Sequence, residues 1–265
     1  MVDAHVHIHE HFDLNRLFLI SLQNFRKSLN QFKIFESFES FLMLTESAGV
    51  NGFTALKAIA NQEIPGNDFI VQKTEENCSL KITTSGGQDL FVVNGKQIVT
   101  AEKLEVLALG LNRDYPDGRP LHYVLDDLEA SGCLRVLPWG AGKWLGNRGK
   151  IIDALIATWH SGSIFLGDNG NRPSFWPLPK VFERGRERAM YNLPGSDPLP
   201  FPESEKKSGS SGFMLRGQVT PEAPFQSLLS AVQSMPQAAL PYGTPESFIP
   251  FVKNQLKMQL FKKRR

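Results

Sequence analysis

Residues 2–9 of this 265-residue chain read VDAHVHIH, and this stretch sets the expectations for the fold. Its apolar residues occupy the even positions and its polar residues the odd ones, which is the period of a β-strand. Asp3, His5 and His7 therefore project from one face of the predicted strand. An N-terminal strand of a parallel α/β fold carries its functional side chains toward its carboxyl end.

Helical and extended patterns follow this strand along the chain. Residues 14–33 predict a helix with one apolar stripe, and Phe41–Thr45 predicts a short strand buried on both faces. Residues 69–99 predict a β-meander, and Thr100 is expected to cap a helix over residues 101–109. Beyond these, the pattern predicts helices near 121–130, 150–159, 179–188, 222–234 and 246–261, with strands at 134–138, 163–166 and 190–193.

This order of elements predicts an α/β fold. We expect a single (β/α) TIM-type barrel of seven or eight strands, regular or distorted, with a small β-meander insertion. A doubly wound sheet is the alternative. The sequence has no internal repeat and no clear linker, so residues 1–265 are expected to form one domain.

The bulk composition excludes several classes of protein. Cys78 and Cys133 are the only cysteines, which excludes a disulfide framework and an all-thiolate zinc site. No apolar run approaches the ~20 residues of a membrane span, and no secretory signal opens the chain, so a cytoplasmic location is expected. Residues 251–265 hold six basic residues and no acid, so the total of +2 leaves −4 for residues 1–250. A nucleic-acid partner is therefore not favoured.

Residues of metal-ligand type end several of the predicted strands. His5 and His7 share one strand face, and this i, i+2 spacing lets both imidazoles bind one ion. Glu46, Asp168 and Asp197 follow later strands at the edge where the two histidines are expected. The alternative is an exposed strand face that simply bears polar side chains.

Three neighbours of these histidines have lesser expected roles. Asp3 shares their face and is expected to support them from behind. His9 lies at the strand end, where it is a candidate substrate contact. His11 lies beyond the strand, and its presence in the cluster is expected to be incidental.

Two short motifs resemble a known superfamily. Asp-Ala-His-Val-His (3–7) resembles the Asp-x-His-x-His signature of the amidohydrolase-like metal-dependent hydrolases, which include the TatD-type nucleases and, more distantly, the PHP phosphoesterases. Gly-Ser-Asp-Pro (195–198) is similar to the last-strand motif of that group. The resemblance implies that Asp197 binds a metal ion and, as the catalytic residue, accepts a proton from the attacking water.

The chain also departs from that superfamily. Its members usually carry two more histidines on middle strands, whereas here only His122 and His160 remain, at an expected helix start and helix end. Glu46 and Asp168 would then take the places of the missing ligands. The expected site binds one or two divalent ions (Zn, Mn or Fe) through His5, His7, Glu46, Asp168 and Asp197.

Two glycine-rich turns suggest an anionic substrate. Residues 139–150 contain Lys143 and Arg148, and residues 167–173 contain Arg172. These cations and the nearby backbone N–H groups could hold a phosphate or a carboxylate, although the first turn lacks the spacing of a Walker A loop. The alternative is a pair of tight turns whose basic side chains are solvated.

The leading hypothesis is a metal-dependent hydrolase that acts on a small anionic, phosphoester-like substrate, with His9, Lys143, Arg148 and Arg172 as substrate contacts. A second is a non-catalytic barrel that binds a metal or a phosphate ligand and has a regulatory or interaction role. A third is a sugar- or nucleotide-phosphate-binding protein whose histidines hold no metal. The polar segment 203–212 is expected to be a mobile loop that could close over the site.

Overall fold

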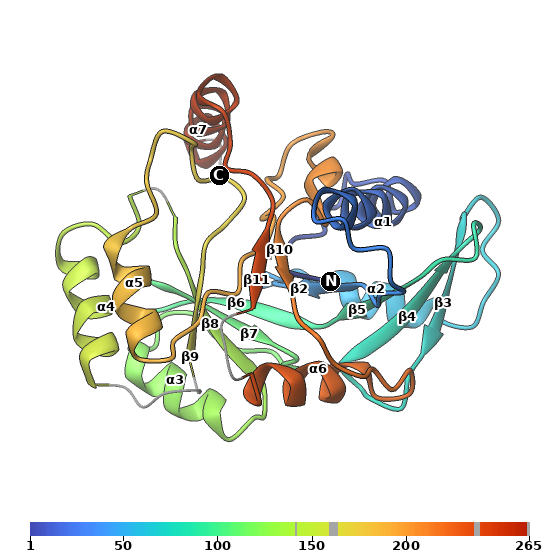
Figure 1. Cartoon of the computed structure of the whole chain (residues 1–265), viewed down its shortest axis with the longest axis horizontal. Coiled ribbons are helices and arrows are strands. Elements are labelled where there is room, and N and C mark those ends of the chain that lie inside the picture. The colour runs from blue at the N-terminus through green and yellow to red at the C-terminus, as the bar shows by residue number, and fades with distance from the viewer. Residues whose placement is uncertain (141, 159–163, 236–238, 264–265) are drawn as a thin grey trace.

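The strands of the protein form two separate sheets in a computed structural model that describes residues 1–140, 142–158, 164–235 and 239–263 (Figure 1). The first is a mixed seven-stranded sheet in the order β11–β10–β1–β2–β5–β4–β3. The second is a four-stranded sheet in the order β6–β7–β8–β9. The strands are β1 (Val2–Val6), β2 (Phe41–Leu44), β3 (Phe69–Lys73), β4 (Ser79–Thr84), β5 (Asp89–Val93), β6 (Gly95–Val99), β7 (Glu105–Leu109), β8 (Leu134–Pro138), β9 (Ile164–Gly167), β10 (Gly212–Met214) and β11 (Leu240–Tyr242).

Helices cover the outer faces of both sheets. The described helices are α1 (Leu14–Gln31), α2 (Gly52–Ala58), α3 (Leu121–Glu129), α4 (Asn147–Thr158), α5 (Lys180–Glu187), the 3-10 helix η1 (Ser204–Lys207), α6 (Pro224–Gln233) and α7 (Phe248–Lys263). Figure 1 shows α1 on one side of the seven-stranded sheet and α6 on the other, with α3, α4 and α5 beside the second sheet. Within the described ranges, none of these helices has the length and apolar character needed to cross a membrane.

Three apolar clusters form the core. One lies between α1 and the seven-stranded sheet, and another lies between the second sheet and α3, α4 and α5. The third is shared by both sheets and α6, and it includes Ala4 of β1, Leu107 of β7 and Phe225 of α6. The second face of each sheet is therefore buried as well, which explains the continuous apolar runs of β2 and of residues 106–109 in β7.

The prediction of a single (β/α) TIM-type barrel is wrong. The described strands form two sheets, neither of them closed, and β6–β7 and β7–β8 are antiparallel pairs. The chain changes sheets at Gly95, where a Cβ atom would lie 2.4 Å from the carbonyl oxygen of Leu44. Only glycine permits this approach, so the segment 90–99, expected as one strand, becomes β5 and β6 in different sheets.

The helix predicted for residues 101–109 is also wrong. Lys103 has a left-handed backbone, with φ of 61°, and the chain turns there into β7, which pairs with β6. Val106 packs into the core beneath α3, whereas Leu107 packs into the core shared by both sheets. Successive side chains point to opposite faces only in a strand, so a strand is needed to bury both residues. This packing outweighs the local preference of Thr100 to cap a helix.

Two further segments differ from expectation, while most of the other elements match. Residues 190–193 contribute an isolated bridge from Asn192 to Leu166 rather than a strand. The polar segment 203–212 contains η1 and packs on α1, where Asn24 donates to the carbonyl oxygens of Lys206 and Ser208. Because Ser208 is fully buried, the expectation of a mobile loop is wrong.

Candidate metal centre

The segment that carries Asp197 lies directly against β1. The N–H of Asp197 donates to the carbonyl oxygen of His5 at 2.8 Å, and the N–H of Ala4 donates to that of Pro194 at 3.2 Å. A Cβ atom on Gly195 would lie 2.2 Å from the backbone nitrogen of His5, so glycine is required for this contact. The two motifs of the sequence therefore meet at the carboxyl end of β1.

His5, His7 and Asp197 form a compact cluster. Asp197 Oδ1 lies 3.5 Å from Nε2 of His5 and 3.5 Å from Nε2 of His7, and the two Nε2 atoms are 3.1 Å apart. Two ligands that bind a tetrahedral ion at about 2.0–2.1 Å are about 3.4 Å apart. The three atoms therefore have the spacing of ligands that share one ion, and their set of two imidazoles and a carboxylate suits a divalent metal.

The local electrostatics favour the protonation states that a metal requires. Burial, together with the neighbouring His5, lowers the pKa of His7 to about 3, so its imidazole is neutral near pH 7. Burial acts to raise the pKa of Asp197, but its electrostatic interactions with the neighbouring His5, His7 and Lys143 outweigh it and lower this pKa to about 2. A neutral imidazole and an ionised carboxylate are the forms that bind metal ions.

Two asparagines hold Asp197 in place. Asn169 Nδ2 donates to Asp197 Oδ2 at 2.9 Å, and Asn171 Nδ2 donates to the backbone oxygen of Asp197 at 2.8 Å. Asp197 has a φ of 48°, a left-handed conformation that costs free energy in a residue other than glycine. Sequence reasoning missed both asparagines, because amide residues in a glycine-rich turn usually serve the turn itself.

Gln97 brings the second sheet to the same site. Its Oε1 lies 3.2 Å from Nε2 of His5, and its backbone N–H donates to the carbonyl oxygen of Glu46 at 2.9 Å. Glu46 therefore contributes to the site through its backbone, by fixing the strand that carries Gln97. The amide oxygen of Gln97 is a further polar atom close to the candidate ligands.

The structure does not bring the other two predicted carboxylate ligands into the cluster. Glu46 Oε2 pairs with Lys96 Nζ at 2.9 Å, and its Oε1 accepts from the backbone N–H of Phe53 at 2.7 Å, at the start of α2. Asp168 accepts from Arg172 Nε at 2.9 and 3.1 Å. Each carboxylate is thus neutralised by a nearby cation, an arrangement that the strand-end argument did not consider.

The predicted anion-binding cations already have partners within the chain. Lys143 Nζ contacts both carboxylate oxygens of Glu105 at 2.5 Å. Arg148 donates to the carbonyl oxygen of Gly142 at 2.9 Å, and Arg172 donates to that of Trp176 at 2.5 Å as well as to Asp168. Among these three cations, Lys143 is the one whose charge lowers the pKa of both His7 and Asp197. It is therefore the best placed to contact a substrate bound beside these two residues.

The remaining histidines lie in different surroundings. His9 Nε2 is 3.2 Å from the carbonyl oxygen of Pro198, and its ring stacks on that of His7 at 5.7 Å between centroids. His9 therefore adjoins the Asp197 segment, and its role as a substrate contact stays a prediction, whereas His11 is exposed. His122 is exposed near the start of α3, and His160 lies outside the described residues.

Comparison with known proteins adds evidence on the fold alone. No family model and no curated protein matches the chain. Among solved structures, the chain is similar to the crystal structure of PsfC from Pseudomonas syringae PB-5123, with a TM-score of 0.53 and 14% sequence identity. The match covers 99% of this chain and 97% of that one, so the likeness extends over nearly the whole length of both.

Proposed function

We propose that His5, His7 and Asp197 bind a divalent metal ion and that the protein is a metal-dependent hydrolase. The observation that carries this proposal is the spacing of the three candidate ligand atoms, which lie within 4.8 Å of one another at the end of β1. Zn²⁺, Mn²⁺ and Fe²⁺ all accept two imidazoles and a carboxylate. The resemblance to amidohydrolase-like enzymes rests on the same residues and points to the same chemistry.

The number of protein ligands supports a catalytic role over a structural one. Structural zinc sites usually have four protein ligands, whereas catalytic sites have three and keep one position open for water or substrate. A divalent ion bound here would lower the pKa of a coordinated water to near 7. We assign the acceptance of that proton to Oδ2 of Asp197, which accepts a hydrogen bond from Asn169.

The substrate we propose is a small anionic compound of the phosphoester kind. Lys143 supports this choice, because its ammonium group lies close enough to influence both His7 and Asp197. Lys143 has three donors, of which Glu105 occupies only part, so a phosphate oxygen could share the group. Arg148 and Arg172 would have to leave their present partners, and we therefore assign them a lesser role.

The test is hydrolysis assayed on a panel of phosphoesters, lactones and amides, with protein purified without a His tag and loaded with Zn²⁺, Mn²⁺ or Fe²⁺. We expect phosphoester turnover that falls at least about 10²-fold in His7→Ala and Asp197→Asn. His122→Ala removes an exposed histidine and should retain full activity. Turnover that survives in His7→Ala would contradict the proposal.

A second candidate is a protein that binds the metal ion without catalysis. The observation that favours it is the engagement of Lys143, Arg148 and Arg172 by partners within the chain, which leaves no fully free cation for an anionic substrate among these three. A metal-loaded protein that is inert toward the whole panel would favour this candidate.

A further inference from the structure

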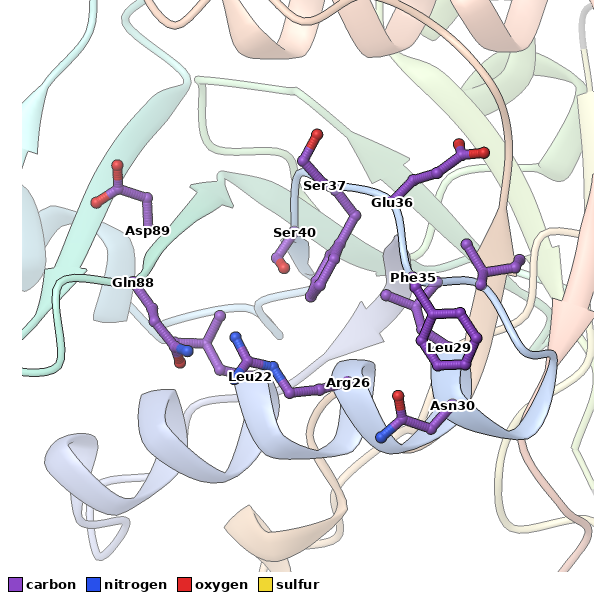
Figure 2. Close-up of a pocket in the computed structure, with 12 residues that line it drawn as sticks. Leu22, Arg26, Leu29, Asn30, Phe35, Glu36, Ser37, Ser40, Gln88 and Asp89 are labelled. Atoms are coloured by element: carbon purple, nitrogen blue, oxygen red, sulfur yellow. The ribbon is translucent and has the colours of Figure 1, made fainter.

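A hollow lies away from the candidate metal centre, between α1, the segment 34–40 and the turn that joins β4 to β5 (Figure 2). Its volume is about 440 Å³, within the size range of small-molecule sites. Figure 2 shows Gln88 and Asp89 on one side, Leu29 and Phe35 on the other, and Arg26 along α1 between them. This hollow shares no residue with the cluster of His5, His7 and Asp197.

One wall of the hollow contains a polar group without a partner. Ser40 is 1% exposed, and among the described residues its hydroxyl has no hydrogen-bond partner. A buried hydroxyl left without a hydrogen bond costs about 1–3 kcal/mol, so such groups usually have a partner. The oxygen of this hydroxyl has almost no accessible surface, so Ser40 lies in the wall behind the hollow and is not itself a ligand contact.

The hollow also offers a cation whose partner is neutral. With its amide turned so that the oxygen faces Arg26, Gln88 accepts from Nη2 at 2.5 Å and from Nη1 at 3.2 Å. Asp89 is already engaged by Lys81 Nζ at 2.7 Å and by the hydroxyl of Thr83. The guanidinium of Arg26 therefore has donors left for an anionic group, which it binds more strongly than a neutral one.

The opposite wall is apolar. Leu29 is buried in α1, whereas Phe35 is 83% exposed, a large exposure for an aromatic ring beside a hollow. Ile34 and Phe38 are partly buried and line the same space. An apolar ligand body against these side chains would cover Phe35 and remove its ring from water.

We propose that this hollow is a binding site for a small organic acid with an apolar body. The acid group contacts Arg26, and the apolar part contacts Phe35 and Phe38. Glu36 also lines the hollow, and it disfavours a ligand with several negative charges. The site is thus distinct from the metal centre in both position and ligand chemistry.

The test is isothermal titration with three matched probes: 4-phenylbutyrate, its neutral primary amide and 4-phenylbutylamine. We expect the carboxylate to bind at least about fivefold more tightly than the amide, with the amine weaker still. Arg26→Gln should weaken carboxylate binding by about tenfold, whereas Ser40→Ala should leave it unchanged. Lys27→Gln, which removes an exposed charge next to Arg26, should leave it unchanged.

A carboxylate could also bind at the metal centre, so the titration is repeated with His5→Ala. Binding that persists in His5→Ala but is lost in Arg26→Gln supports the hollow as the site. Equal affinity for the acid and the amide, tighter binding of the amine, loss of binding in His5→Ala, or no binding by any probe would overturn the proposal.

Discussion

Asp3 and Ser196 are 193 residues apart in sequence and form a buried hydrogen bond of 2.5 Å from Ser196 Oγ to Asp3 Oδ2. The backbone N–H groups of Ser196 and Gly209 also donate to this carboxylate, at 2.8 and 2.7 Å. Asp3 thereby ties β1 to the segment that carries Asp197 and to the turn after η1. It lies behind the candidate metal centre, on the same strand face as His5 and His7.

We predict that Asp3→Asn lowers the free energy of unfolding by about 2–4 kcal/mol, because the new amide group would face donors and leave them unpaired. Chemical denaturation measures this change. Asp13→Asn is the matched control, because Asp13 caps α1 at the surface and asparagine caps equally well. A stability of Asp3→Asn within about 0.5 kcal/mol of the wild type would be inconsistent with the role we assign to Asp3.

Asn169→Ala and Asn171→Ala should each weaken metal binding by about 10- to 100-fold, since residues that orient a metal ligand commonly have effects of this size. The fold should persist in Asn169→Ala, because that side chain is half-buried. Asn171 is 8% exposed and also accepts from Lys207 Nζ at 2.6 Å, so Asn171→Ala should lose some stability as well. Competition with a chromogenic chelator measures the affinity. Asn77→Ala removes an exposed asparagine that is not part of the candidate metal centre, so it should leave the metal affinity unchanged. Unchanged affinity in both site variants would show that Asp197 needs no such support.

Glu46→Gln should leave the metal content unchanged but destabilise the fold by about 2–4 kcal/mol, because buried Lys96 would lose its buried charged partner and keep only the exposed Asp114, at 3.4 Å. Metal analysis and chemical denaturation of the same sample separate the two effects. Loss of metal from this variant would contradict the prediction and indicate that Glu46 is a metal ligand. Lys96→Met, which removes the cation, should likewise keep the metal.

The two cysteines should react slowly with a thiol reagent at pH 8. Burial raises the pKa of both Cys78 and Cys133 to about 11, above the model-compound value, so the neutral thiol predominates and the reactive thiolate forms only as the pH rises. Two pKa units correspond to a thiolate fraction about a hundredfold lower than in the unfolded chain. Labelling in native buffer and in denaturant measures this difference, and equal rates in both would contradict it.

The sequence predicted the elements whose signals are local. The alternation of residues 2–8 and the apolar stripe of residues 14–31 predicted β1 and α1, because these patterns need no tertiary context. The division into two sheets depends on the contact of Gly95 with Leu44, which only the folded chain reveals. The sequence predicted a helix where the structure has β7. Both faces of β7 are buried, so its sequence lacks the alternation of apolar and polar residues that indicates a strand.

The candidate site was predictable to the same extent. The spacing of His5 and His7 on one strand face was a local signal, and the resemblance of residues 195–198 to a known motif supplied Asp197. Ion pairs such as Glu46 with Lys96 and Asp168 with Arg172 could not be anticipated, because a strand-end residue shows its type but not its partner. The roles of Asn169 and Gln97 depend on three-dimensional contacts with no sequence signature.

The most direct test of the central claim is a metal titration of the tag-free protein, stripped with a chelator and titrated with Zn²⁺ against a competing indicator. We predict one tightly bound equivalent in the wild type and in His122→Ala, and a loss of at least about tenfold in affinity in His5→Ala, His7→Ala and Asp197→Asn. Absence of a bound equivalent in the wild type, or an affinity in all three site variants equal to that of the wild type, would contradict the claim that His5, His7 and Asp197 form a metal centre.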